Sequence, residues 1–240
     1  MLHASYGYNL RPGVSEISRS IHSLHMTIFY ICLVIAVLVF SVMFYAIIWH
    51  RKSRGAKAAH FHEHLIVEII WTFIPCVILV AMAIPAARLI IKTHDMEDSE
   101  LSIKVTGHQW YWEYEYLAEG LRIYSRLATP QAQIHNRALK GPHYLREVDQ
   151  PLVIPQNKKV RFLTTANDVI HSWWVPDFGI KRDAIPGFIN ETWTRVETPG
   201  IYRGQCAELC GALHGFMPIV VEVKTPEDYE IWLKAQKEHL

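Results

Sequence analysis

The sequence predicts a two-helix membrane hairpin followed by an all-β sandwich domain, which a short C-terminal helix closes. Three features predict it: two long apolar runs within residues 26–92, many short β-rich segments after residue 100, and a helix-start pattern near residue 225. Half of the residues are hydrophobic, yet a fifth are charged, so the apolar residues must be unevenly distributed. We expect an outer-side tail at 1–25, a transmembrane hairpin at 26–92 and the β domain at 93–240.

Charge divides the chain at the same place. Residues 1–91 carry seven Lys/Arg and three acids, which leaves 17 of the 24 Lys/Arg and 20 of the 23 Asp/Glu for the remainder. A basic anchor therefore precedes a mildly acidic domain. This asymmetry argues against nucleic acid as a partner and favours a basic protein as the partner of the β domain.

The first span follows a polar tail without a signal-peptide pattern, so either a signal peptide has been removed or the tail crosses the membrane with the first helix. Residues 28–49 contain no charge, and about 22 helical residues at about 1.5 Å each cross the roughly 30 Å hydrocarbon layer. The connector at 50–64 holds four Lys/Arg. By the positive-inside rule it lies in the cytoplasm, with both ends of the hairpin outside.

The second span, residues 65–91, contains Pro75 and Pro85, which spanning helices tolerate where neighbours satisfy the freed carbonyls. Glu68 lies within its first turn. An ionisable residue at that depth indicates a function, and the alternative is a carboxylate stabilised at a helix N-terminus.

The β domain is predicted from short segments separated by Pro, Gly and Asn/Asp. They are residues 101–106, 110–116, 160–165, 172–175, 191–197, 200–205 and 219–223. Residues 127–159 contain four prolines and are expected to form an irregular excursion without an assigned function. At the C-terminus, Thr225 can cap a helix that has proline and acids in its first turn, and Tyr229, Trp232 and Leu233 can face the sandwich.

A loop near the C-terminus gathers four soft donors: Cys206, Cys210, His214 and Met217. Thiolate, thioether and imidazole are the ligands that copper prefers, whereas calcium and magnesium prefer oxygen. A mononuclear blue-copper site uses one Cys, two His and a Met, and His171 is the natural upstream histidine. The second Cys exceeds that set, so we predict a dinuclear copper site.

Two alternatives stand beside the copper site. Cys206 and Cys210 could form a disulfide in an oxidising compartment, which leaves the surrounding donors without a purpose. A zinc site with four thiolates needs two further thiols, but Cys32 and Cys76 fall in the apolar runs.

The loop at 206–217, together with the stretches at 107–112, 169–176 and 183–187, resembles subunit II of the haem-copper cytochrome c oxidases, and the resemblance covers essentially the whole chain. It implies a cupredoxin-like Greek-key barrel in a bacterial or mitochondrial inner membrane, on the periplasmic or intermembrane side. Electrons from cytochrome c would pass through the copper centre to the haems of subunit I, which reduces oxygen to water and translocates protons. Subunit III and membrane lipid are further implied partners.

The resemblance also implies individual roles. Glu208 would add a copper ligand through its backbone carbonyl and bind a magnesium ion, shared with subunit I, through its side chain. Trp110 would be the entry point for electrons, and Glu68 would lie at the mouth of a proton-uptake path. An acidic docking patch for the basic cytochrome c is predicted from Glu113, Glu115, Asp168 and Asp177.

Trp110 presents a conflict at this stage. In a regular strand over 107–116, it would share a face with His108, Trp112 and Tyr114 and be buried with them. A role in electron entry therefore requires a bulge or a turn near Gly107.

No haem is expected on this chain, because it has no Cys-x-x-Cys-His motif and its apolar spans have no central histidine. Three rival functions remain. A quinol oxidase subunit of the same fold would lack the copper ligands. A membrane-anchored copper-delivery protein would leave Glu68 and the aromatic stretch unexplained, and a periplasmic receptor domain would need the disulfide.

Overall fold

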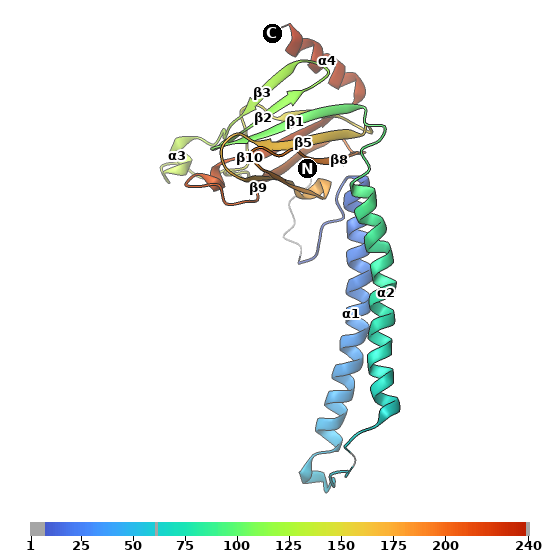
Figure 1. Cartoon of the computed structure of the whole chain (residues 1–240). Helices are drawn as coiled ribbons and strands as arrows, with labels where there is room; N and C mark the ends of the chain where they lie inside the picture. Colours follow the sequence, from blue (N-terminus) through green and yellow to red (C-terminus); the bar gives the residue numbers. More distant parts are fainter. Residues whose placement is uncertain (1–7, 61, 239–240) are drawn as a thin grey trace. The chain divides into compact units, whose positions relative to one another are not determined.

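The computed structural model describes residues 8–60 and 62–238 of the chain (Figure 1). It divides into two compact units. One contains residues up to Ile21 and from Ile91 onward, and it holds the β domain. The other, His22–Ile90, contains most of the helical hairpin.

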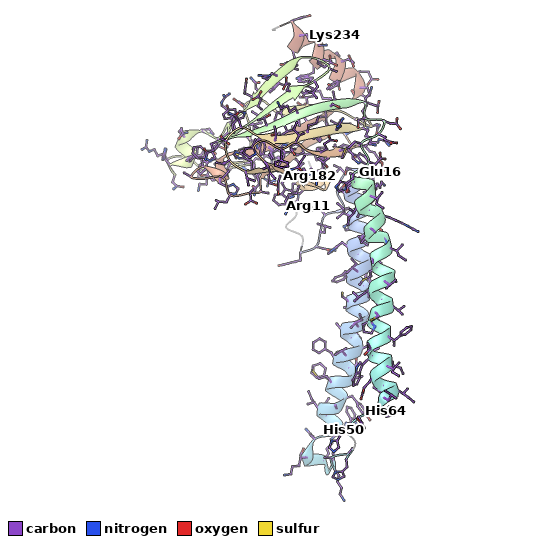
Figure 2. All side chains as sticks on the ribbon, viewed as in Figure 1. Arg11, Glu16, His50, His64, Arg182 and Lys234 are labelled. Carbon is purple, nitrogen blue, oxygen red and sulfur yellow. The ribbon has the colours of Figure 1, made fainter. Side chains whose placement is uncertain are left out.

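The hairpin consists of α1 (Glu16–Trp49) and α2 (Leu65–Thr93), joined by a connector that includes the 3-10 turn η1 (Lys52–Arg54). Both helices are long and apolar enough to cross a membrane. Figure 2 shows His50 and His64 at the connector end of the hairpin. Helix α1 begins at Glu16, within the stretch expected to be a polar tail, because Ser15 and Ser18 cap its first turn by mutual side-chain and main-chain hydrogen bonds.

Two five-stranded sheets form the β domain. The first has the order β3-β2-β1-β5-β8, and the second has the order β4-β10-β9-β6-β7. The β1/β5 and β4/β10 pairs are parallel, and the others are antiparallel. The strands are β1 (Leu101–His108), β2 (Tyr111–Tyr116), β3 (Leu121–Ser125), β4 (Leu152–Pro155), β5 (Val160–Ala166), β6 (His171–Val175), β7 (Ile180–Ala184), β8 (Asn190–Thr194), β9 (Gly200–Cys206) and β10 (Pro218–Lys224).

Alternation along the strands builds the core between the sheets. In β1, β2 and β5, every second side chain is buried and its neighbour is partly exposed. Aromatic rings fill much of the interior, with Phe162 and Trp173 in contact from opposite sheets at a ring-centroid distance of 4.8 Å. The predicted fold class, two apolar helices followed by an all-β domain and a short C-terminal helix, is confirmed.

Several strands were not predicted. The sequence analysis missed β3, β4 and β7, and β4 lies inside the stretch at 127–159 that was expected to be irregular throughout. Pro155 ends β4 at the edge of its sheet, where a residue without an N–H group is tolerated. The rest of that stretch holds only the single-turn helix α3 (Gln131–Ile134) among regular elements.

The C-terminal helix α4 (Pro226–Lys237) forms as expected. The Thr225 hydroxyl accepts a hydrogen bond from the Asp228 N–H, at 3.2 Å, and so caps the first turn. Tyr229 and Leu233 are buried, and the Trp232 ring packs against Tyr116 and Tyr229. The helix therefore closes one end of the sandwich.

Gly204 allows β6 and β9 to approach each other closely. A Cβ atom at this position would lie 1.9 Å from the Trp174 carbonyl oxygen, which is main chain and has little freedom to move. We expect Gly204→Ala to destabilise the domain by about 2 kcal/mol or more, because the two strands must separate. Thermal unfolding of the full chain in detergent measures this effect. Gly141→Ala is the control, since no atom lies within 4 Å of its added methyl group, and an equal melting temperature for both variants would contradict the prediction.

Candidate metal centre

Strand pairing brings the upstream histidine beside the late loop. His171 is the first residue of β6 and Cys206 is the last residue of β9, and the two strands run antiparallel with Trp173 opposite Cys206. The loop from Cys206 to Met217 closes at its base, where the Cys206 N–H donates to the Met217 carbonyl at 3.3 Å. His214 lies in the 3-10 turn η3 (His214–Phe216) of that loop. All the soft donors predicted from sequence thus converge at one end of the sandwich.

Four potential ligand groups surround the two thiols. Cys206 Sγ and Cys210 Sγ are 3.9 Å apart. Cys206 Sγ lies 3.9 Å from His171 Nδ1 and 3.3 Å from the Glu208 carbonyl oxygen. Cys210 Sγ lies 3.5 Å from both His214 Nδ1 and Met217 Sδ. Each thiol therefore has one imidazole beside it. The carbonyl of Glu208 lies beside Cys206, and the thioether of Met217 lies beside Cys210.

The donor set fits a soft metal ion and not a disulfide. Both cysteines are free thiols, and their separation is nearly twice the about 2.05 Å of a sulfur–sulfur bond. Two thiolates that bind one ion at about 2.3 Å in tetrahedral geometry lie about 3.8 Å apart, which matches the separation found here. The metal-binding atoms of His171, Cys206 and Cys210 all lie within 4.8 Å of one another. Sulfur and imidazole nitrogen favour copper or zinc over calcium or magnesium.

Asp168 orients the buried imidazole. His171 is completely buried, and its Nε2 atom lies 2.9 Å from Asp168 Oδ1, so its Nδ1 atom faces Cys206. A carboxylate on the far nitrogen of a ligand histidine fixes the ring and raises its basicity. Asp168 itself is held by the N–H groups of Gln109 and Val169, both at 2.7 Å. The sequence analysis assigned Asp168 only to docking; its position three residues before His171 was the available signal.

The turn between β1 and β2 supports the other thiol. Gln109 Nε2 donates to the Cys210 carbonyl at 2.9 Å, and Trp110 Nε1 donates to the same oxygen at 3.2 Å. Gly107 makes room for the site, because a Cβ atom there would lie 2.8 Å from the His171 ring. The turn in the first sheet thus supports, through two side-chain donors, the main chain of a site whose ligands come from the second sheet and its loop.

Burial and hydrogen bonding act in opposite directions on the two thiols. Burial raises the pKa of Cys206, but hydrogen bonds from the His171 imidazole and from the Ser172 N–H outweigh it, so the net pKa is lowered. Burial raises the pKa of Cys210 as well, and the negative charge on Cys206 raises it further. One proton leaves the pair readily, whereas removal of the second needs a compensating cation such as a metal ion.

Trp110 occupies a turn, which is the geometry that its predicted role requires. Residues 109–110 separate β1 from β2, so Trp110 does not continue the alternation of Trp112, Tyr114 and Tyr116, which are fully buried. Its indole ring is partly exposed and packs against the core. The structure therefore resolves the conflict over burial, while the role in electron entry stays a prediction.

The predicted acidic patch is largely paired within the molecule. Glu113 lies 2.9 Å from His108 Nε2 and 3.2 Å from Arg122 Nε, and Glu115 also contacts Arg122, at 3.2 Å. Asp177 lies 3.7 Å from Arg11, and Asp168 holds the imidazole described above. Docking by these four acids stays a prediction, and each of them already has a structural partner.

Glu208 and Glu68 differ in their surroundings. The Glu208 carbonyl faces Cys206 while its residue is exposed, so its side chain is available to a second ligand. Glu68 Oε1 accepts a hydrogen bond from the His64 N–H at 3.2 Å, which caps the start of α2. This capping is the structural alternative that the sequence left open for Glu68, and it does not exclude a role in proton uptake.

Fold and site together define a class: a membrane-anchored β-sandwich protein with a largely buried centre of two cysteines, two histidines and a methionine, of which only His214 is partly exposed. Comparison with known protein families then identifies the family of this chain. Residues 101–224 match the family model described as cytochrome c oxidase subunit II, periplasmic domain, and residues 3–89 match its transmembrane domain. The chain belongs to the cytochrome c oxidase subunit II family.

Individual relatives agree with this assignment. A probable cytochrome c oxidase subunit 2 of Rickettsia conorii is 41% identical over 227 residues, which cover 94% of this chain and 70% of the relative. The cytochrome c oxidase subunit 2 of Cereibacter sphaeroides is 35% identical over 96% of this chain and 80% of its own length. The crystal structure of the periplasmic domain of subunit II from Bradyrhizobium japonicum superimposes with a TM-score of 0.53, at 40% identity, over 59% of this chain and 96% of that domain. The chain is thus a subunit of a haem-copper oxidase complex and a membrane protein.

Replacement of Asp168 tests whether its carboxylate, by orienting His171, increases the affinity of the site for metal. Asp168→Asn keeps the shape but loses the charge that orients His171, and we expect metal affinity to fall by about 10- to 100-fold. Copper titration of the full chain measures this. Asp177→Asn is the matched control, because Asp177 belongs to the same predicted docking patch and contacts Arg11 instead of a donor histidine. Equal copper affinity in the two variants would show that Asp168 does not act on the metal centre.

Proposed function

We propose that this chain is the electron-transfer subunit of a cytochrome c oxidase. It accepts electrons from cytochrome c and delivers them to the haem groups of subunit I, where oxygen is reduced to water and protons are translocated. The oxygen-reducing site then belongs to the partner subunit. The observation that carries the proposal is the arrangement of two thiols 3.9 Å apart, each with its own imidazole.

The donors favour two copper ions over one. A single ion would leave part of a set of two thiols, two imidazoles, a thioether and a carbonyl unused, whereas two ions would use the whole set, with one imidazole for each ion. Two bound copper ions would supply a one-electron carrier. His171, Cys206 and the Glu208 carbonyl would hold the ions on one side, and Cys210, His214 and Met217 on the other.

Most of the donors of this centre are shielded from water. Cys206, Cys210 and Met217 each have at most 3% of their surface exposed, and His171 has none. Main-chain and side-chain hydrogen bonds hold the imidazole of His171 and the carbonyl of Cys210 in place. A site that cannot rearrange changes little between oxidation states, which favours fast electron transfer.

Trp110 is the proposed entry point for electrons. Its indole N–H donates directly to the carbonyl of Cys210, a ligand residue, while its ring is partly exposed. A partly exposed aromatic ring that is hydrogen-bonded to a ligand residue supports this role. Cytochrome c would dock over Trp110, steered by the acids Glu113, Glu115, Asp168 and Asp177.

The remaining assignments rest on family resemblance. The exposed Glu208 side chain would bind a magnesium ion shared with subunit I, since a carboxylate is the ligand that a hard cation prefers. Glu68 would lie near the entrance of a proton path into subunit I. Subunit III and membrane lipid would complete the surroundings, with the copper domain on the outer side of a bacterial or mitochondrial inner membrane.

The copper content separates this function from its rivals. For the full-length chain loaded with copper, we expect two coppers per chain and an electron paramagnetic resonance spectrum with more hyperfine lines than one copper nucleus produces. Cys206→Ser and His214→Ala should lose this spectrum. Cys32→Ser, which changes an exposed thiol in α1, should keep it. A single-nucleus spectrum, or a metal-free disulfide form, would reject the dinuclear centre.

Replacement of Trp110 tests the entry of electrons. In the assembled oxidase, we expect Trp110→Phe to slow cytochrome c oxidation by roughly tenfold or more, because the hydrogen bond to the Cys210 carbonyl and the indole ring are lost. Copper content should not change. Trp232→Phe, on α4 beside Tyr116, is the control and should leave the rate intact. Equal rates in the two variants would place electron entry elsewhere.

A further inference from the structure

A polar pocket lies away from the metal centre, between the edge strands of the two sheets. Strand β7 is at one edge of the second sheet and β8 is at one edge of the first. The pocket has a volume of about 140 Å³, and Arg182 of β7, Thr192 of β8, and Thr93 and His94 at the end of α2 contribute to its lining. All its lining residues belong to the unit that contains the β domain. Its volume suits a small polar group such as a phosphate.

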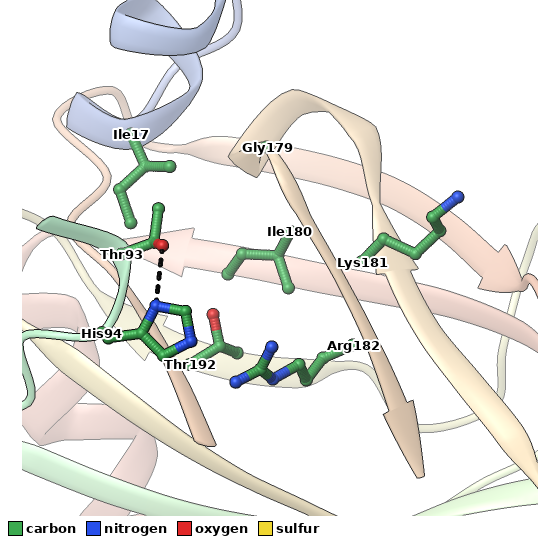
Figure 3. A pocket seen from close by; sticks show the side chains of 8 residues that line it. All are labelled: Ile17, Thr93, His94, Gly179, Ile180, Lys181, Arg182 and Thr192. Atoms are coloured by element: carbon green, nitrogen blue, oxygen red, sulfur yellow. Dashed lines mark hydrogen bonds between the residues drawn. The ribbon is translucent and has the colours of Figure 1, made fainter. Parts of the chain in front are cut away.

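The lining is basic and rich in donors. Figure 3 shows the Arg182 guanidinium and the His94 imidazole converging near the Thr192 hydroxyl, whereas the Lys181 ammonium points away from them. Thr93 Oγ1 and His94 Nδ1 lie 3.4 Å apart at the same rim. No acidic side chain is among the residues that line the pocket. A cluster of this kind attracts an anion.

Within residues 8–60 and 62–238, Arg182 has no ion-pair partner, unlike the comparable arginines. Its Nε atom is buried without a hydrogen bond, and no ion pair joins its guanidinium to any residue that the structure describes. The Nε atoms of Arg195 and Arg203 are also unpaired, but the guanidinium groups of these residues contact Glu16 and Glu147. Arg161, another half-buried strand residue, forms a two-bond pair with Glu191. A buried guanidinium nitrogen without an acceptor indicates that an external acceptor completes it.

Nearby acids and carbonyls are already engaged. Glu16 pairs with Lys92 and Arg195, and Asp95 pairs with Lys159. The end of a helix carries partial negative charge, but at the end of α2 the carbonyls of Ile91 and Lys92 accept hydrogen bonds from His94, Asp95 and Trp193. These groups therefore compete little for the guanidinium, and they leave the charge of the pocket positive.

A charged residue on an edge strand can also serve to prevent association between sheets. That role needs a charge in contact with water. Arg182 as a whole is partly exposed, but its Nε atom is buried in the cavity and has no hydrogen-bond partner among the described residues. Protection of the edge therefore does not explain why this nitrogen is buried without an acceptor.

We propose that this pocket binds the phosphate group of a membrane phospholipid. A guanidinium group presents paired donors that match phosphate oxygens, and the Thr192 hydroxyl and His94 imidazole add donors around them. Thr93 is the last residue of α2, and the apolar run of that helix ends just before it, at Ile91. Chain connectivity alone keeps the pocket near the level of lipid headgroups, where phosphate is abundant.

The test uses the purified full-length chain in dodecyl maltoside, a detergent without phosphate. Three probes are compared by native mass spectrometry and by thermal shift: a phosphatidylglycerol, a galactolipid with the same acyl chains, and inorganic phosphate. The variants are Arg182→Gln, Thr192→Val and the control Arg161→Gln, which removes the same charge from a half-buried arginine that already has a carboxylate partner. Thr192→Val keeps the shape of the pocket if Arg182→Gln folds poorly.

We expect the chain to retain phosphatidylglycerol in preference to the galactolipid. Arg182→Gln should weaken that retention by roughly 10- to 100-fold and Thr192→Val by less, while Arg161→Gln should match the unmodified chain. Stabilisation by inorganic phosphate that the lipid does not displace would support the phosphate site but assign it to free phosphate. Equal retention of both lipids, or equal retention by the unmodified chain and both pocket variants, would overturn the proposal.

Discussion

The contact between β6 and β9 is the constraint on which the metal centre depends. It brings the first residue of one strand next to the last residue of the other, so His171 and Cys206 meet inside the protein. Gly204 permits this approach, because any side chain there would collide with the Trp174 carbonyl. The loop that follows β9 then needs only a few residues to return Cys210 to the same place. A site built on strands in this way is rigid before any metal binds.

The second sheet does not build the centre alone. The turn between β1 and β2, in the first sheet, donates two hydrogen bonds to the Cys210 carbonyl, and its Gln109 N–H holds Asp168, which orients His171. The same turn exposes part of the Trp110 ring. Support of the ligands and the proposed contact with cytochrome c therefore depend on one short segment.

Much of the candidate site could be predicted from the sequence because its donors are chemically unusual. Cysteine, histidine and methionine within one loop have few structural explanations, and the separation of His171 from them is typical of a site built across strands. The orienting role of Asp168 was missed, since an acid beside a histidine in sequence has many possible orientations. The strands β3, β4 and β7 were missed because they are short and lie among prolines, glycines and charges, where the alternation of apolar residues is weak.

The sequence by itself determined the two apolar helices, the class of the β domain and the identity of the soft donors, since hydrophobic length, period-two alternation and ligand chemistry are local properties. Only the tertiary structure decided how Trp110 is turned out of its strand, which acids are already paired, and that Arg182 lines a pocket where no other residue that the structure describes forms an ion pair with it. These features depend on pairs of residues from different strands. Their distances follow from strand register and packing, which no single stretch of sequence specifies.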